Sequence, residues 1–223
     1  MIFVNRFKAH MALHPKISAA FEEFKPIVRR WYEKSADADA LYKIAISNFI
    51  HGAFRCTEKT EVLTSWGQLS LRTANIDDYD FINALERDKD SIPWVNNWPL
   101  GLRIEKFGDN NFFQTIIEIN GRLPVGFIDF RDMLHDTQVE LKRIVISEKG
   151  KGYGKEAMYL SQKFAFEVLG RNRLYLGTKV ENVRAQHVYH STGFTLVEPE
   201  NIAYFHIFKE DYLNAISEGI IND

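Results

Sequence analysis

The stretch Ile144-Val145-Ile146-Ser147-Glu148-Lys149-Gly150-Lys151-Gly152-Tyr153-Gly154-Lys155 carries the strongest structural signal in this chain. It predicts a buried strand, a turn with three alternating glycines, and then a helix. Glycines leave backbone N–H groups unshielded, and a helix N-terminus adds a partial positive charge. We therefore predict an anion site, suited to a phosphate or pyrophosphate, with Lys149, Lys151 and Lys155 adding charge. A plain turn without a ligand is the alternative interpretation.

Two common phosphate motifs do not fit this turn. A P-loop has four residues between its first glycine and Gly-Lys, whereas Gly150 and Gly154-Lys155 have three between them. A dinucleotide fingerprint has the spacing G-x-G-x-x-G, and here the spacing is G-x-G-x-G. A nucleotide-binding domain is therefore disfavoured.

A second informative stretch lies one strand further on, from Val180 to Phe194. Asn182 is placed to cap a helix, and helical spacing puts Ala185 and Tyr189 on the same face. Gly193 is a typical end for that helix. The histidines of this helix, His187 and His190, lack partners in a metal-binding pattern, so no metal is predicted.

The regions around these two stretches predict a mixed α/β fold. Strands are expected at 69–72, 112–119, 125–130, 139–146, 173–180 and 203–208, with a hairpin turn at Asn120-Gly121. Helices are expected at about 75–87, 153–169 and 182–191, and residues 91–100 are expected to form a loop.

The first 67 residues have a different pattern. Helices are expected from Lys16 to Lys34, kinked or divided at Pro26, and from about Asp37 to Phe54. Residues 1–67 carry a net charge of +3 and residues 68–223 a net charge of −5. We predict a helical extension (1–67) followed by a mixed α/β domain (68–223). The aromatic faces of the extension should dock on that domain or on a second copy of the chain, so a homodimer is one expectation.

Composition narrows the class of protein. The 223 residues are 45% hydrophobic and 26% charged, with a formal net charge of −2, so nucleic acid is not expected as a partner. No apolar run is long enough to span a bilayer, and the N-terminus has no apolar signal core, so we expect a cytoplasmic protein that binds no membrane. The single cysteine, Cys56, excludes an intramolecular disulfide and a cysteine-rich metal site.

Together, the glycine turn and the motif Asn182-x-x-Ala185-x-x-x-Tyr189-x-x-x-Gly193-Phe194 resemble the GNAT superfamily of acyl-CoA-dependent N-acetyltransferases. Lys149 stands where this family usually has Arg or Gln. The start of the matched region, with Leu69 to Arg72 and then Asp77-Asp78, is similar to the branch that includes ribosomal-protein N-terminal acetyltransferases. The resemblance covers about residues 68–210 and implies a twisted mixed sheet flanked by helices.

The resemblance also implies the cofactor site. Acetyl-CoA would be the co-substrate, with its pantetheine arm along the strand Ile144, Val145 and Ile146. The pyrophosphate would sit on the turn made by Lys149, Gly150, Lys151, Gly152, Tyr153, Gly154 and Lys155. Asn182 and Ala185 would contact the cofactor.

The implied reaction is direct transfer of acetyl to a primary amine, either a protein N-terminus or a small molecule. Tyr189 would be the general acid, and a core aromatic with a satisfied hydroxyl is the alternative. Glu140 is the first choice of base, because strand alternation puts it on the same side as Lys142 and Ile144. Glu118, Asp129 and His135 are runners-up, and an ion pair with Lys142 or Arg143 is the structural alternative for Glu140.

The sequence leaves two alternatives for the loop around Trp94 and two for the function. Trp94, Trp98 and Pro99 either line the acceptor site or pack as core or lid residues. The second function considered is a non-catalytic acyl-CoA-binding module that signals to a partner through its N-terminal helices.

Overall fold

A computed structural model describes residues 2–197 and 201–222 of the chain. Contacts between residues divide it into two compact units. The helical unit comprises Met1–Lys59, Asn75–Tyr79 and Trp98–Asn110, and the sheet unit comprises Thr60–Ala74, Asp80–Asn97 and Asn111–Asp223. Among the described residues, no helix is both long and apolar enough to cross a membrane.

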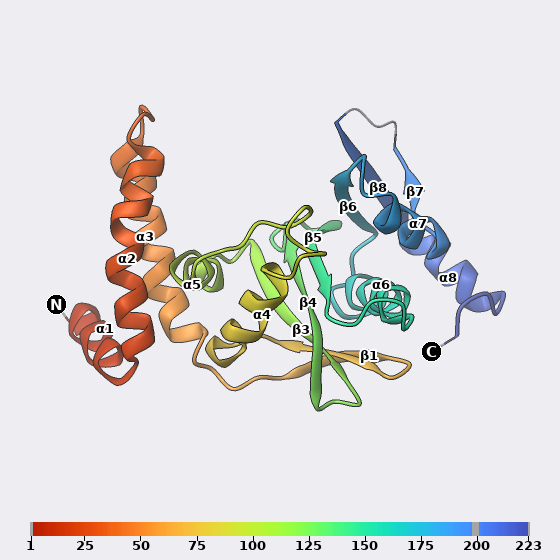
Figure 1. The fold of residues 1–223 in the computed structure, drawn as a ribbon, viewed down its shortest axis with the longest axis horizontal. Helices are drawn as coiled ribbons and strands as arrows, with labels where there is room; N and C mark the ends of the chain where they lie inside the picture. Colours follow the sequence, from red (N-terminus) through yellow and green to blue (C-terminus); the bar gives the residue numbers. More distant parts are fainter. Residues whose placement is uncertain (1, 198–200, 223) are drawn as a thin grey trace. The chain divides into compact units, whose positions relative to one another are not determined.

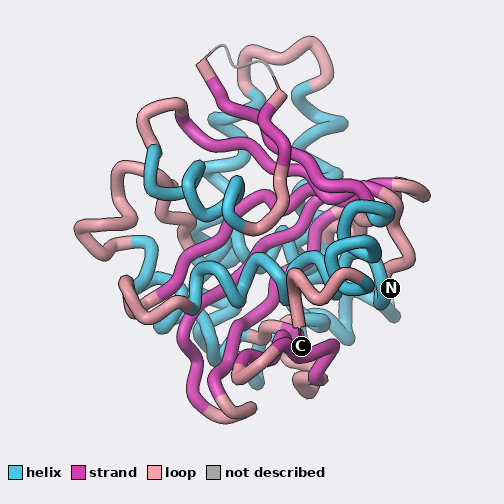
Figure 2. Tube along the Cα trace, turned by 90° about the vertical axis from the view of Figure 1, so that its right-hand side faces the viewer, coloured by secondary structure: helices cyan, strands magenta, loops and turns pink. Residues whose placement is uncertain are grey.

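The sheet unit is built on eight strands in the order β1-β2-β3-β4-β5-β6-β8-β7. Every neighbouring pair is antiparallel except β5 and β6, which are parallel. The mixed α/β fold predicted from the sequence is confirmed, and Figure 2 shows the strands (magenta) running side by side. The strands are β1 (Val62–Trp66), β2 (Leu69–Thr73), β3 (Phe112–Ile119), β4 (Leu123–Arg131), β5 (Gln138–Ile146), β6 (Arg173–Lys179), β7 (Thr195–Leu196) and β8 (Ile202–Phe208).

Helices of the sheet unit cover an apolar face of these strands. Helix α6 (Tyr153–Lys163) continues into a wider turn, η2 (Phe164–Val168), whose Phe164 packs on Phe130 of β4 with ring centroids 4.9 Å apart. The other helices are α4 (Tyr79–Glu86), which follows the short turn η1 (Ile76–Asp78), α7 (Val183–Ser191) and α8 (Lys209–Ser217). The β3–β4 hairpin turns at Asn120 and Gly121, both with positive φ, as the Asn-Gly pair predicts.

The helical unit contains α1 (Ile2–Leu13), α2 (Pro15–Tyr32), α3 (Ala38–Arg55) and α5 (Leu100–Gly108). Its core joins Phe24, Phe49 and Ile104, all nearly inaccessible to solvent. In Figure 1, α2 and α3 run side by side and α5 lies next to α3. Of the two expectations for Pro26, division of the helix is wrong, because one helix runs through this position, and a kink stays a prediction.

Helix α3 and helix α5 cross at unusually short range. A Cβ added to Gly52 would lie 1.7 Å from the carbonyl oxygen of Ile104, and one added to Gly108 would lie 1.8 Å from that of Asn48. Only glycine fits at both positions, because any side chain would occupy the space of the opposite backbone. Helix α5 therefore belongs to the same core as the N-terminal helices, although 43 residues, 57–99, lie between Cys56 and Leu100 in sequence.

Candidate active site

The parallel strands β5 and β6 pair only at one end. Their register runs from Gln138 opposite Arg173 to Glu140 opposite Tyr175 and stops there, although β5 continues to Ile146 and β6 to Lys179. The two strands therefore diverge in the middle of the sheet, which leaves the β5 edge from about Leu141 to Ile146 facing a gap. Backbone groups on such an edge can pair with an extended ligand as if it were another strand.

The glycine turn closes the far end of β5. Gly150 and Gly152 have positive φ values of 82° and 84°, so the turn depends on glycine at both positions. Gly152 precedes the first residue of α6, as the sequence predicts. A Cβ added to Gly150, Gly152 or Gly154 would meet no heavy atom within 4 Å, so open space lies over the turn.

The lysines of this turn differ in their surroundings. The Nζ of Lys149 donates to the carbonyl oxygen of Ile146. Burial lowers the pKa of Lys149, and the nearby Arg184 cation lowers it further. Lys151 is paired instead with Glu148, which raises its pKa. Lys155 lies over the ring of Tyr159, 5.9 Å from its centroid.

Helix α7 presents the second motif to the same gap. The side chain of Asn182 accepts a hydrogen bond from the backbone N–H of Ala185 at 3.2 Å, so it caps the helix as predicted. Tyr189 is 7% exposed and packs edge-on against Phe205, with centroids 5.3 Å apart. Burial raises the pKa of Tyr189 to about 12, which keeps its hydroxyl protonated at neutral pH.

One cleft of about 570 Å³, entirely within the sheet unit, connects these features. It is lined by nine of the predicted residues, Ile144, Val145, Ile146, Lys149, Gly150, Gly154, Asn182, Ala185 and Tyr189. Lys151, Gly152, Tyr153, Lys155 and Glu140 do not line it. Tyr153 packs instead in the apolar core of the sheet unit.

Sequence reasoning missed part of the wall. Residues 89–95 supply Lys89, Asp90, Ser91, Pro93, Trp94 and Val95, and α6 and α7 add Met158, Val188 and Arg184. Trp94 was recognised from the sequence as a possible site residue, but Trp98 and Pro99 are not among the lining residues. The other loop positions carry no motif, so only their path in space brings them to the cleft.

Glu140 is not on the face that strand alternation predicts. A bulge places Arg143 opposite Asp129 and Leu141 opposite Phe130, so Lys142 is an extra residue in β5. The bulge shifts the alternation by one, and Glu140 therefore shares a face with Arg143, whereas Ile144 shares one with Leu141. The expectation that Glu140 and Ile144 lie on one side is wrong for this reason.

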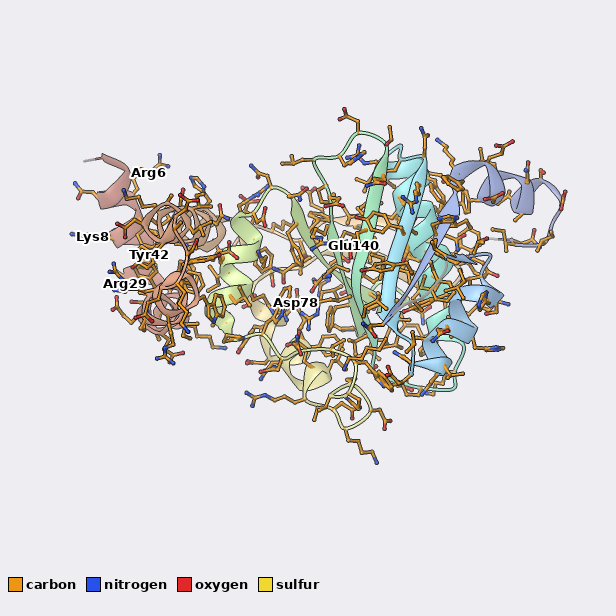
Figure 3. The ribbon with its side chains drawn as sticks, turned by 90° about the horizontal axis from the view of Figure 1, so that it is seen from above. Arg6, Lys8, Arg29, Tyr42, Asp78 and Glu140 are labelled. Carbon is orange, nitrogen blue, oxygen red and sulfur yellow. The ribbon has the colours of Figure 1, made fainter. Side chains whose placement is uncertain are left out.

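The Glu140 carboxylate is held in ion pairs. Its oxygens lie 2.6 Å from a guanidinium nitrogen of Arg131 and 3.5 Å from Nζ of Lys142. Figure 3 shows Glu140 on its strand in the sheet. The pairing with Lys142 matches the structural alternative considered for this residue. Its role as the base stays a prediction.

The runners-up for the base have partners of their own. Glu118 pairs with Arg72 at 2.7 Å and Asp129 with Arg143 at 3.3 Å. The Nδ1 of His135 accepts a hydrogen bond from the backbone N–H of Thr137 at 3.2 Å. None of the three is among the residues that line the cleft. Within the described ranges, no group of three or more His, Cys, Asp or Glu side chains is arranged to hold a metal ion.

A diverging pair of parallel strands, a glycine turn and a capped helix with a buried tyrosine define an acetyltransferase of the GNAT class. Residues 68–195 match the family described as Acetyltransferase (GNAT) domain, and the chain belongs to this family. It is an acyl-CoA-dependent N-acetyltransferase, and acetyl transfer to an amine is its reaction.

The chain is similar to spermidine N(1)-acetyltransferases. It is 23% identical over 167 residues to the enzyme of Vibrio cholerae, and this alignment covers 66% of this chain and 96% of the relative. It is 33% identical over 110 residues to that of Escherichia coli K12, which covers 48% of this chain and 58% of the relative.

Solved structures agree on the fold. The Vibrio cholerae spermidine N-acetyltransferase in complex with CoA and spermine has a TM-score of 0.58 and 21% identity, over 66% of this chain and 99% of that one. A dodecameric structure of the same enzyme has a TM-score of 0.53 and 22% identity, and the match covers 66% of this chain and 97% of that one. These relatives do not confirm the narrower resemblance to ribosomal-protein acetyltransferases, and they give no support to a non-catalytic module.

Proposed function

We propose that this protein transfers the acetyl group of acetyl-CoA to a primary amine of a small polyamine. The observation that carries the proposal is a cleft that joins the open β5 edge, the glycine turn and Tyr189. The acceptor class is supported by the relatives, which are named as spermidine acetyltransferases, one of them solved with CoA and spermine. Glu181 lines the cleft and supplies a carboxylate suited to a cationic acceptor.

In this proposal the cofactor lies along the cleft. The pantetheine arm pairs with the backbone of Ile144 to Ile146, where β6 has diverged. The pyrophosphate lies over the glycine turn, whose N–H groups and α6 N-terminus favour an anion. Lys149 and Arg184, both in the cleft wall, add positive charge. The open space above Gly154 fits a phosphate in close contact with the backbone.

The chemistry needs no covalent enzyme intermediate. The neutral amine nitrogen attacks the thioester carbonyl carbon, and its electron pair forms the new C–N bond. Backbone N–H groups of the β5 edge stabilise the resulting oxyanion. The C–S bond then breaks, the amine proton passes to a base or to water, and the Tyr189 hydroxyl donates to the departing sulfur.

The direct test is turnover with defined acceptors. The purified chain is incubated with acetyl-CoA and either spermidine, spermine, a simple monoamine or a peptide with a free N-terminus. Released thiol is measured, and the product is identified by mass. We expect the polyamines to give the highest kcat/KM. Preferential acetylation of the peptide would contradict the polyamine assignment, and no transfer to any amine would contradict the reaction.

A matched variant tests the cofactor site separately. Gly154→Ala adds one methyl group into open space and requires no positive φ, so the fold should be kept. The same methyl group occupies the position proposed for the pyrophosphate. We expect the Kd for CoA, measured by calorimetry, to rise at least about tenfold, equivalent to roughly 1.4 kcal/mol. Unchanged affinity in the folded variant would show that the phosphates lie elsewhere.

A further inference from the structure

The loop between α4 and α5, residues 87–97, forms one wall of the cleft but belongs to neither diverging strand. It contributes the six lining residues from Lys89 to Val95 other than Ile92. Its own turns are hydrogen bonded, with the backbone N–H groups of Trp94 and Val95 donating to the Ser91 carbonyl at 2.9 and 3.0 Å. The loop is therefore a folded segment whose position depends on what holds it.

Two cations hold this loop, one from each of the diverging strands. Nζ of Lys179, the last residue of β6, donates to the carbonyl oxygen of Pro93 at 2.9 Å. Arg143 of β5 donates through Nη2 to the carbonyl oxygen of Asn96 at 2.5 Å. The loop thus spans the opening between β5 and β6, with one charge-assisted bond on each side.

The two anchors differ in strength. Arg143 is buried and also pairs with Glu86 at 2.5 Å and with Asp129 at 3.3 Å. Asn97 reinforces this end, because its side-chain amide donates to Glu86 at 3.1 Å and to Asn83 at 2.8 Å. Lys179 is exposed, so its hydrogen bond to Pro93 lies at the protein surface, where water can compete with it. The β5 side is a fixed attachment, and the β6 side is one that a single substitution can release.

We propose that Lys179 and Arg143 are positioning residues. They hold the loop 87–97 in place as one wall of the cleft, and they thereby set the affinity for acyl-CoA. The inference rests on the proposed function for the identity of the cleft's ligand. If the loop lines the cleft for only a fraction of the time, the protein can bind CoA well only during that fraction. The apparent affinity for CoA is then the intrinsic affinity multiplied by that fraction. Lys179 governs the middle of the loop at Pro93, and Arg143 governs its end at Asn96.

The experiment compares Lys179→Met with Lys179→Arg in the full-length protein. Lys179→Met removes the donor at an exposed position, so the fold should be kept, and Lys179→Arg retains a donor and the charge. Arg122→Met is the matched control, because it removes an exposed cation from the β3–β4 hairpin, which does not line the cleft. Amide hydrogen exchange and the Kd for CoA are measured for each protein.

We expect Lys179→Met to speed exchange in residues 88–96 without CoA and to raise the Kd for CoA about three- to tenfold, the effect of losing one hydrogen bond that is exposed to solvent. Lys179→Arg should restore both values toward wild type, and Arg122→Met should change neither. A higher Kd with unchanged exchange would mean that Lys179 acts only by its charge, which would overturn the proposal. Unchanged Kd and unchanged exchange would overturn it too.

The exchange arm also separates this proposal from the function. If the wild-type protein binds no CoA, the proposed function fails, but exchange in the loop still reports whether Lys179 holds it. Arg143→Lys provides a second test. The single ammonium group of a lysine cannot donate to both Glu86 and Asn96 with the geometry of the planar guanidinium. We expect faster exchange toward the Asn96 end of the loop in that variant, and wild-type exchange there would count against Arg143 as an anchor.

Discussion

Tyr189 is the side chain on which the proposed chemistry depends most. It lines the cleft, it is buried against Phe205, and burial raises its pKa to about 12. Tyr189→Phe keeps the ring and its packing and removes only the hydroxyl. We expect kcat to fall about 10²- to 10⁴-fold with little change in the KM for acetyl-CoA. Steady-state kinetics check this, and an unaltered kcat would leave Tyr189 a packing residue.

The raised pKa of Tyr189 also predicts how the stability of the folded state changes with pH. The folded pKa lies above the value near 10 of an unfolded tyrosine, so the folded state holds the proton more tightly. The stability gained from the neutral buried phenol is complete below about pH 10 and is lost as pH rises from about 10 toward 12. Across the neutral range the hydroxyl stays protonated and available as a donor.

Residue-level prediction succeeded where a motif fixed the position. Asn182 caps α7, Ala185 and Tyr189 share the cleft, and the glycine turn follows β5, all as their spacing indicates. The face on which Glu140 lies was predicted wrongly, because a bulge in β5 cannot be read from alternation of residue types, and its role as the base stays a prediction. Residue-level prediction also gave no account of Arg143 and Lys179, whose bonds to the loop depend on partners 47 and 86 residues away.

Among the elements, the close crossing of α3 and α5 gives the sharpest prediction. Gly52→Ala would place a methyl group 1.7 Å from the Ile104 carbonyl oxygen, so the two helices must separate. We expect a loss of about 1–3 kcal/mol or more in the free energy of unfolding, as for an overpacked core. Gly154→Ala is the matched control, since its Cβ meets open space. Equal denaturation midpoints for the two variants would contradict the tight crossing.

The sequence predicted strands with clear alternation and long amphipathic helices, and missed short or mixed elements. Strands β3, β4, β5 and β6 and helices α2, α3 and α6 lie close to their expected bounds. Helix α1 was not expected, and neither were α5, α8 and β1. Helix α5 is only nine residues long and follows Pro99. Its core contacts come from α2 and α3, which are distant in sequence, so no local sequence pattern predicts it.

For the molecule as a whole, contacts between residues divide the chain differently from the boundary predicted at residue 67, which stays a prediction. The helical unit takes in residues 98–110, and the sheet unit begins at Thr60 with β1. Ile104 of α5 is buried with Phe24 and Phe49 of the N-terminal helices, and the backbone N–H of Ile76 donates to the Cys56 carbonyl at 2.7 Å. A cut at residue 67 therefore divides one core between two fragments.

We accordingly predict that residues 1–67 and 68–223, expressed separately, are each less stable than the corresponding part of the intact chain. The short fragment loses Ile104, whose burial is worth roughly 1.5–3 kcal/mol, and the long fragment exposes the apolar face of α5 to water. Thermal unfolding of each fragment, alone and after mixing, measures the effect, and mixing should restore cooperativity. A cooperatively folding 1–67 fragment, together with a 68–223 fragment of undiminished stability and activity, would show instead that the N-terminal helices form an autonomous domain and that α5 needs no partner from them.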